Sequence, residues 1–403
     1  MEFLDIFQDL ISVASSLHES EEKLAILTHL IENPDIQIPF ITSEEHNQIT
    51  QYIKDVDFDF KNKIPYPKND YSDFKFIDLF AGIGGFRQAL QNQGGECVFS
   101  SEWDKHAAKT YFANYGVFPF GDIRNIEAQS IPDHDILCGG FPCQPFSIAG
   151  VSKKNSMGRA TGFSDETQGT LFFEIARILE AKRPLFFFLE NVKNIKSHDK
   201  GRTMEVIQKT FDELEYKCVM DVVDGREWVP QHRERVFFLG YDSHRISFRD
   251  GEFVIPKHPG DDYVYPTLDT IIDTTSHDRT LTDGTWKSLQ RHKEKHALKK
   301  NGFGYRMLDY PITSKQVTWT ISARYYKDGA DCLVPQKGLN PRKLSIKEIL
   351  RLQGFDDKKF IFPVGITHAY KQVGNSVVIP AIEESAKLLA GILRQRKTEL
   401  GKI

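Results

Sequence analysis

Short apolar runs that alternate with helical patterns are the feature that most constrains the fold of this chain. The runs cover residues 76–80, 97–100, 135–138, 185–189 and 236–239. Each run ends in a polar or glycine-rich turn, and helical periodicity separates several of them, most clearly over residues 170–181 and 201–214. This order predicts an α/β main domain over residues 75–240, with a mostly parallel sheet covered on both faces. Ligands of such sheets bind at the carboxyl ends of the strands, so the candidate functional residues follow each run.

The regions on either side of the main domain have a different character. Residues 1–74 show apolar residues at helical spacing, and Thr42 with Glu45 predicts a capping box. Residues 241–335 lose the alternation and predict a smaller irregular domain, and residues 336–403 predict helices that return to the main domain. Because residues 1–74 hold none of the candidate functional residues, we expect a helical extension that is dispensable for the chemistry and able to self-associate.

Composition argues against several classes of protein. The 403 residues are 40% hydrophobic and 27% charged, and the longest apolar runs are too short to span a bilayer. The N-terminus is acidic and has no signal-peptide pattern. The five cysteines are scattered without a Cys-x-x-Cys pair, which argues against a disulfide scaffold and a structural zinc site. We therefore expect a cytoplasmic protein with no membrane partner and no metal.

The net charge of −4 conceals an asymmetry along the chain. Residues 1–74 carry a net charge of −10, and residues 75–403 carry +6. Within the basic part, residues 287–306 hold seven Lys or Arg and a single acid. A basic body with an acidic front is compatible with nucleic-acid binding, although basic runs are also common on solvated helix faces.

A glycine-rich turn follows the first apolar run, in the sequence Asp78-Leu-Phe-Ala-Gly-Ile-Gly-Gly85. Such a turn between a strand and a helix lets the backbone approach a nucleotide closely, but its spacing is not that of the dinucleotide fingerprint. About 20 residues later, Glu102 follows the next run, where an acid can accept from ribose hydroxyls. A tight structural turn and a surface acid would explain the same residues.

Three polar positions at the ends of later runs suggest chemistry on a planar substrate. Cys143 follows the third run, where a thiolate nucleophile would be exposed, whereas Cys138 inside that run is expected to be buried and structural. Glu190 ends the fourth run, and Arg233 and Arg235 precede the fifth. A carboxylate and an arginine at neighbouring strand ends could hold a heterocycle by its edge, or each could belong to a surface ion pair.

Five ordered motifs make this chain similar to the DNA (cytosine-5) methyltransferase family. They are Phe80-Ala-Gly-Ile-Gly-Gly, Pro142-Cys143-Gln144, Glu190-Asn191-Val192, Gln231-x-Arg233-x-Arg235 and Gln372-Val373-Gly374-Asn375-Ser376. The resemblance covers about residues 75–390 and extends to the bacterial Dcm-type methylases, which modify an inner cytosine of CCWGG or CCNGG. It implies a Rossmann-like, S-adenosylmethionine-dependent sheet of seven mostly parallel strands, a target-recognition domain at residues 241–335, and a DNA cleft between them.

The resemblance also implies roles for individual residues. Cys143 is the nucleophile, and Glu190 holds the N3 and amino edge of cytosine. Arg235 donates to the cytosine O2, and Arg233 belongs to the same catalytic motif. The residues implied to bind S-adenosylmethionine are Asp78, Phe80, Ala81, Gly82, Gly84, Gly85, Glu102, Trp103, Asp122, Ile123, Pro142, Asn375 and Ser376. Those implied to contact double-stranded DNA are Ser147, Lys153, Lys154, Arg306, Thr320 and Arg324, and we expect Arg306 or Arg324 to read a guanine. A further matching segment, residues 342–355, is implied to support the recognition domain.

Two other functions are compatible with parts of this pattern. A related transfer-RNA cytosine methyltransferase would carry a Cys-Phe-Thr element, which this sequence does not contain. A DNA-binding regulator with a degenerate site would lack some catalytic motifs, and all of them are present. The resemblance therefore favours a bacterial DNA methyltransferase, either a member of a restriction-modification pair or an orphan, monomeric on DNA and associated with the nucleoid in the cytoplasm.

Overall fold

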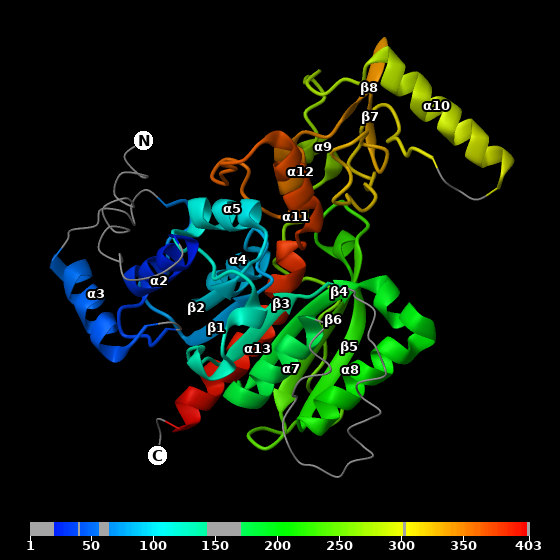
Figure 1. The fold of residues 1–403 in the computed structure, drawn as a ribbon. Helices are drawn as coiled ribbons and strands as arrows, with labels where there is room; N and C mark the ends of the chain where they lie inside the picture. The colour runs from blue at the N-terminus through cyan, green and yellow to red at the C-terminus, as the bar shows by residue number, and fades with distance from the viewer. Residues whose placement is uncertain (1–19, 39–40, 56–63, 143–170, 301–303, 401–403) are drawn as a thin grey trace. The chain divides into compact units, whose positions relative to one another are not determined.

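The chain forms two compact units. A computed structural model describes residues 20–38, 41–55, 64–142, 171–300 and 304–400. The first unit comprises Met1–Val222, Arg235–Ile255 and Ser385–Ile403, and the second comprises Val223–Glu234 and Pro256–Glu384. Figure 1 shows the helices and strands of both units.

A sheet with six described strands is the centre of the first unit. The strands are β1 (Phe74–Leu79), β2 (Gly95–Ser101), β3 (Ile136–Gly140), β4 (Phe186–Val192), β5 (Tyr216–Asp224) and β6 (Glu234–Asp242), in the order β2-β1-β3-β4-β6-β5. β1 pairs in parallel with β2 and β3, β3 pairs in parallel with β4, and β6 runs antiparallel to β4. The mostly parallel α/β sheet predicted from the sequence is therefore confirmed, and the carboxyl ends of its parallel strands meet at one edge.

The edge beside β2 differs from the seven strands that the resemblance implied. Within the described ranges, Phe120 forms a single parallel bridge with Ser101 instead of a seventh strand. The Phe120 amide donates to the Ser100 carbonyl at 2.8 Å, and the Glu102 amide donates to the Phe120 carbonyl at 2.8 Å. The segment that ends at Phe120 thus lies along β2, but its regular pairing is limited to this point.

Helices cover the sheet, which explains why consecutive residues of a central strand are buried. The helices of the first unit include α4 (Gly85–Asn92), α5 (Lys105–Tyr115), α7 (Leu171–Lys182), α8 (Arg202–Glu213) and, from Ser385 onward, α13 (Ile379–Leu400). Short 3-10 helices are η2 (Ile123–Asn125), η3 (Ala128–Ser130), η4 (Lys193–Lys196), η5 (His198–Gly201) and η6 (Gly225–Glu227). Consecutive residues of β4 are fully buried, which requires packing on both faces of the sheet.

The N-terminal segment contributes two described helices, α2 (Ser20–Glu32) and α3 (Ser43–Asp55). The capping box expected before α3 is confirmed: the Thr42 amide donates to Glu45 Oε2 at 2.7 Å, and the Glu45 amide donates to Thr42 Oγ1 at 3.2 Å. Four apolar residues of α2, namely Ala25, Ile26, Leu27 and Leu30, are fully buried in the same core as the sheet. This packing was not expected for a segment predicted to be dispensable.

The second unit is smaller and less regular than the first, and its bounds differ from the residues 241–335 expected for the recognition domain. Its helices and strands are α9 (Leu268–Ile271), α10 (Asp283–Leu298), β7 (Leu333–Gln336), β8 (Leu339–Lys343), α11 (Ile346–Gln353) and α12 (Ile366–Asn375). β7 and β8 form an antiparallel pair, and Leu281, Leu289 and Leu333 form a small core beside it. None of the helices that the structure describes is long and apolar enough to cross a membrane.

Candidate active site

Glu190 and Arg235 are brought together at one edge of the sheet. Glu190 lies near the end of β4, and the antiparallel pairing of β4 with β6 places Arg235 opposite Val192. The Nε of Arg235 donates to Oε1 of Glu190 at 2.7 Å. The two side chains are only 17% and 11% exposed, so water weakens this ion pair less than it weakens a surface pair. Together they can offer acceptor and donor atoms to the edge of a planar polar ligand.

The loop that leads to Cys143 starts beside Glu190. Gly140, at the end of β3, pairs in register with Glu190, and a Cβ added to Gly140 would lie 3.2 Å from Glu190 Oε2. Asn191 is buried, and its Nδ2 donates to the Phe141 carbonyl at 2.8 Å. Phe141 is therefore fixed to the strand that carries Glu190, two residues before Cys143.

The glycine-rich turn after β1 has a constrained backbone. Phe80 and Gly82 have φ values of 55° and 56°, and Gly84 has a φ of 83°. A Cβ on Gly84 would lie 2.2 Å from the ring of Tyr115, whose hydroxyl donates to the Gly84 carbonyl at 2.9 Å. Glu102 is attached to this turn, because its Oε2 accepts from the Gly82 amide at 2.7 Å. The structure thus brings together the turn and the acid that sequence reasoning assigned to one ligand.

Other residues implied to bind the cofactor surround the same strand ends. Asp78 is buried, and no donor in the described ranges makes a well-formed hydrogen bond to its carboxylate oxygens. Burial raises the pKa of Asp78 well above its usual value. Trp103 is 74% exposed and Ile123 is buried. The carboxylate of Asp122 already accepts from Nε of Arg124, and this hydrogen bond lowers the pKa of Asp122.

Arg233 has a different environment from Arg235. It belongs to the second unit, is 3% exposed, and donates through its guanidinium to the carbonyls of Ile321, Gly374 and Ser376. Arg233 therefore holds two loops of the second unit together. Asn375 ends α12 in this unit and is exposed, whereas Ser376 is buried.

The residues implied to contact DNA differ in their exposure and in the contacts that they already form within the protein. Arg306 is exposed, and its guanidinium lies 5.6 Å from the centre of the Trp319 ring. Arg324 is exposed and forms no ion pair with any residue that the structure describes. The hydroxyl of Thr320 instead donates to the His232 carbonyl at 2.8 Å, so it has a partner within its own unit.

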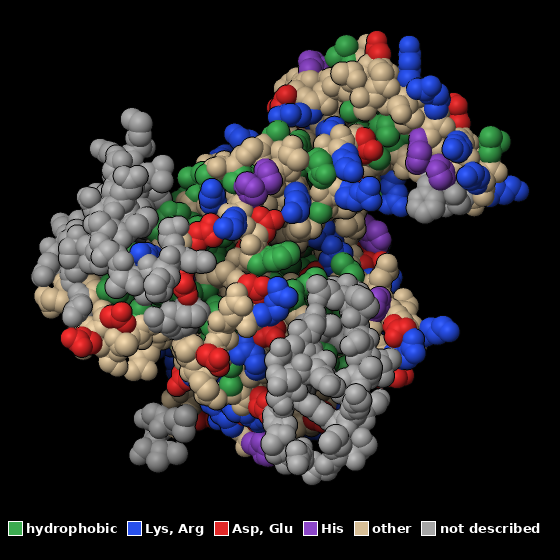
Figure 2. All heavy atoms as spheres, viewed as in Figure 1, with side chains coloured by type: hydrophobic (Ala, Val, Ile, Leu, Met, Phe, Trp, Pro, Cys, Tyr) green, Lys and Arg blue, Asp and Glu red, His purple; other side chains and the backbone are tan. Residues whose placement is uncertain are grey.

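Much of the basic run at residues 287–306 lies on helix α10. Leu289 is the buried residue of this helix, and most of its other side chains are exposed. Lys293 Nζ lies 4.2 Å from the centre of the Tyr305 ring, and this ring also contacts Trp286. Figure 2 shows Lys, Arg and His side chains along α10. The helix thus presents a positively charged surface on a small apolar base.

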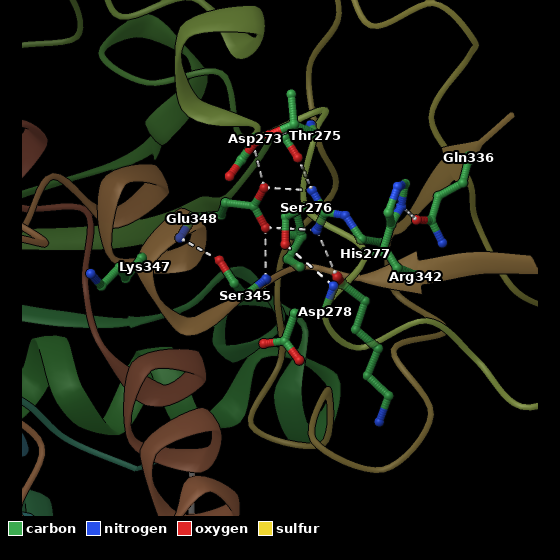
Figure 3. Close-up of polar contacts among 12 residues, drawn as sticks. Asp273, Thr275, Ser276, His277, Asp278, Gln336, Arg342, Ser345, Lys347 and Glu348 are labelled. Atoms are coloured by element: carbon green, nitrogen blue, oxygen red, sulfur yellow. Dashed lines mark hydrogen bonds and ion pairs between the residues drawn. The ribbon is translucent and has the colours of Figure 1, made fainter. Parts of the chain in front are cut away.

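The segment of residues 342–355 is organised around a buried ion pair (Figure 3). Nη1 and Nη2 of Arg342 donate to the two carboxylate oxygens of Glu348 at 2.9 and 2.7 Å, and both side chains are 1% exposed. The same carboxylate accepts from the amides of Asp273 and Ser345, and the Ser345 hydroxyl caps α11. This arrangement joins α11 to the loop that contains Asp273, which is a structural role.

Several predicted residues lie outside the described ranges. They are Cys143, Ser147, Lys153 and Lys154. Pro142, the last described residue before them, is exposed. The expectation that Cys138 is structural is confirmed, because it is fully buried and its thiol donates to the Ile77 carbonyl at 3.1 Å. In the described ranges, no group of three or more His, Cys, Asp or Glu could hold a metal ion.

Two residues have structural roles that were not assigned to them from the sequence. One is Asn191, whose amide fixes Phe141. The other is Arg87, which is fully buried on α4 and donates to Glu32 of α2. An arginine among apolar neighbours such as Phe86, Ala89 and Leu90 is the signal that could have revealed this buried ion pair.

Comparison with known proteins finds bacterial relatives that are similar to this chain in sequence. The DNA-cytosine methyltransferase of Escherichia coli K12 is 44% identical over 82% of this chain and 81% of its own length. The type II methyltransferase M.SsoII of Shigella sonnei is 45% identical over 83% of this chain and 85% of its own length. The type II methyltransferase M.HpaII of Haemophilus parainfluenzae is 40% identical over 78% of this chain and 88% of its own length.

Solved structures share the fold at much lower identity. The Dnmt2 methyltransferase of S. pombe has a TM-score of 0.60 at 16% identity, and covers 81% of this chain and 99% of its own. A DNMT2 mutant from Spodoptera frugiperda has a TM-score of 0.59 at 20% identity, and the match covers 78% of this chain and 99% of the mutant's chain. This likeness supports the Rossmann-like methyltransferase fold and no finer statement.

The family described as C-5 cytosine-specific DNA methylase matches residues 74–390, which is most of the chain. The pair of Glu190 and Arg235 in this chain, and the bacterial relatives of the chain, agree with that match. The chain therefore belongs to the C-5 cytosine-specific DNA methylase family and is a DNA (cytosine-5)-methyltransferase.

Proposed function

We propose that this enzyme methylates carbon 5 of a flipped-out cytosine in a short duplex DNA site, through a covalent adduct with Cys143. The observation that carries the proposal is the Arg235–Glu190 pair at 2.7 Å, beside the strand that leads to Cys143. A planar base edge needs an acceptor and a donor in one plane, and this pair supplies both. Because its relatives are bacterial DNA methyltransferases, we place the proposed reaction in the bacterial cytoplasm, on nucleoid DNA.

The proposed chemistry follows from the reactivity of cytosine. Carbon 5 is a poor nucleophile inside a stacked base pair, so the base is first flipped out at a cost of a few kcal/mol. The Cys143 thiolate adds to carbon 6, while Glu190 shares a proton with N3 and relieves the negative charge on the ring. Arg235 donates to O2 and keeps Glu190 in place. Carbon 5 would then take the methyl group supplied by S-adenosylmethionine, whose sulfur–methyl bond breaks to leave S-adenosylhomocysteine. Loss of the carbon-5 proton returns electrons to the ring and expels the thiolate.

The strand-end residues fit S-adenosylmethionine, which supplies an electrophilic methyl group. Asp78 is a buried carboxyl without a well-formed hydrogen bond, which suits a cationic ligand. Glu102 is held against the glycine turn by the Gly82 amide and can accept from ribose hydroxyls. Exposed Trp103 can cover an adenine face, and Asp122 retains lone pairs beyond those that Arg124 uses.

We assign sequence recognition to the second unit. The exposed helix α10 suits phosphates, which position a protein on DNA without specifying sequence. Arg306 and Arg324 are exposed and are the candidate guanine readers, since bidentate arginine to guanine is the commonest specific contact. The similarity to Dcm-type methylases supports a CCWGG or CCNGG-like site.

Covalent trapping tests the chemistry. Duplex DNA with 5-fluorocytosine at the target position should give a complex that survives denaturing electrophoresis, because fluorine cannot leave carbon 5 as a proton does. Cys143→Ser should form no complex, whereas Cys218→Ser, a matched control at a half-buried thiol, should trap like the wild type. Glu190→Gln should slow trapping by about 100-fold, the usual effect of removing one charge-stabilising group.

The same assay separates the alternatives. Equal trapping by Cys143→Ser would show that the nucleophile is misassigned. Trapping on fluorinated transfer RNA but not on duplex DNA would favour the RNA enzyme. Specific binding of DNA without trapping or methylation would favour the regulator.

A further inference from the structure

Helix α2 lies outside the part of the chain that matches the family, yet it is built into the core of the first unit. The family match begins at residue 74, and α2 ends at Glu32. Ala25, Ile26, Leu27 and Leu30 are all fully buried, in one cluster with residues of β2 such as Phe99. Figure 1 shows α2 beside the β2 edge of the sheet. The helix is thus fixed against the strand that leads to Glu102.

Two adjacent side chains of α2 bind backbone amides at this edge. The Thr28 hydroxyl accepts from the Phe118 amide at 2.9 Å. His29 is buried, its Nδ1 faces the Ala25 carbonyl at 2.8 Å, and its Nε2 accepts from the Ser100 amide at 3.3 Å. Nδ1 therefore carries the proton, because it faces an acceptor while Nε2 faces a donor.

These two contacts reach the segments that carry the adenosine residues. Ser100 lies two residues before Glu102, and Phe118 lies four residues before Asp122. The His29 ring also lies 4.7 Å from the Phe120 ring, and Phe120 bridges β2. In the described ranges, regular pairing at this edge is limited to the bridge between Ser101 and Phe120, and α2 adds the contacts of Thr28 and His29 beside it.

A third side chain of α2 is the counter-ion of a buried arginine. Nη2 of Arg87 donates to Oε1 of Glu32, and these side chains are 0% and 8% exposed. Arg87 is on α4, two residues after Gly85 ends the glycine turn. Asp78 is another buried acid near Arg87, and burial raises its pKa well above the usual value, while the charge of Arg87 opposes this shift. The guanidinium of Arg87 is paired with Glu32, and the carboxylate oxygens of Asp78 accept no well-formed hydrogen bond within the described ranges.

We propose that α2 is part of the cofactor site, with Thr28, His29 and Glu32 as positioning residues for the three segments that bind S-adenosylmethionine. This inference depends on the cofactor residues assigned under the proposed function. A buried cation without its anion is strongly unfavourable, so loss of the Glu32 charge turns Arg87 toward Asp78 and displaces the turn. Loss of the Thr28 acceptor leaves the Phe118 amide unsatisfied and loosens the segment before Asp122.

Binding and kinetics of the full-length protein test the proposal. Glu32→Gln should raise the dissociation constant for S-adenosylmethionine, measured by calorimetry, and KM for S-adenosylmethionine by about tenfold or more, because small displacements of a binding group are costly. KM for DNA should change by less than about twofold. Thr28→Val, which keeps the side-chain shape, should act in the same direction if Glu32→Gln fails to fold. Glu44→Gln, at an exposed position of α3, is the matched control and should bind like the wild type.

The outcomes separate this inference from the function on which it depends. If Glu32→Gln and Thr28→Val fold, melt at lower temperature and still bind S-adenosylmethionine like the wild type, α2 is only structural and the proposal is overturned. If instead Glu102→Ala binds as tightly as the wild type, the assigned cofactor residues are wrong. A wild-type protein that binds no S-adenosylmethionine would contradict the proposed function itself.

Discussion

Arg233 and Arg235 of one short motif have separate tasks, because Arg233 belongs to the second unit and Arg235 begins a segment of the first. Arg235 is on β6 and contacts Glu190, whereas Arg233 is buried under backbone carbonyls of the second unit. Spacing alone could not distinguish them, since both are arginines two residues apart. Arg235 is therefore the residue to substitute in tests of base binding, and Arg233 in tests of folding.

Single side chains should also determine the recognised sequence. We expect Arg306→Ala or Arg324→Ala to relax the preference at one base pair by about 1–3 kcal/mol, because each arginine is exposed and can form two hydrogen bonds to guanine. Bisulfite sequencing of plasmid DNA from expressing cells measures this. Lys315→Ala, at an exposed position of the same unit, serves as the control. Methylation by the wild type at a motif unrelated to CCNGG would contradict the Dcm-type assignment but not the cytosine chemistry.

His29 should make the stability of the first unit sensitive to acid. Burial lowers the pKa of His29 from 6.5 to about 3, with the Ala25 carbonyl opposing this effect. The unfolded chain therefore binds a proton below pH 6.5 that the folded chain binds only near pH 3, so stability falls as pH decreases between these values. At pH 5 the loss is about 2 kcal/mol. Urea unfolding at pH 7 and pH 5 should show that His29→Gln loses less stability than the wild type; equal losses would show that His29 does not titrate in this way.

At the level of elements, α11 and the loop before it depend on one ion pair. Glu348→Gln should destabilise the second unit by about 3–5 kcal/mol, because it leaves Arg342 charged and buried without its partner. Replacing both residues, as Arg342→Met with Glu348→Leu, should recover part of this loss, since no buried charge remains. Denaturant unfolding followed by tryptophan fluorescence measures both variants. A single variant within about 1 kcal/mol of the wild type would show that the pair contributes little.

For the molecule as a whole, the burial of α2 predicts that residues 1–74 are needed for stability, although they hold none of the catalytic motifs. Removing residues 1–70 takes away four fully buried apolar side chains of α2 and exposes the β2 edge that they cover. At about 1.5–3 kcal/mol for each side chain, the loss is comparable with the total stability of a typical domain. We expect the shortened chain to aggregate or to melt far below the full chain. A soluble shortened protein with an unchanged melting temperature and normal S-adenosylmethionine binding would contradict this expectation.

The sequence by itself determined the fold class and the order of the strand ends. Apolar runs and turns are local signals, and the parallel sheet with functional residues at its carboxyl edge follows from their alternation. The five motifs determined the family for the same reason, because each is a short stretch with its own residue types. Strand β5 was missed because it is a partly exposed edge strand with charges at Lys217 and Asp221, which interrupt the apolar pattern.

Only the tertiary structure decided which of these residues meet. The contacts of Thr28 with Phe118 and of Glu32 with Arg87 join positions far apart in sequence, and no periodicity within α2 encodes its partners. The acidic composition of residues 1–74 gave no sign that Glu32 neutralises a buried arginine. Charge counted along a chain does not show which charges become buried together, because burial depends on the packing of distant segments.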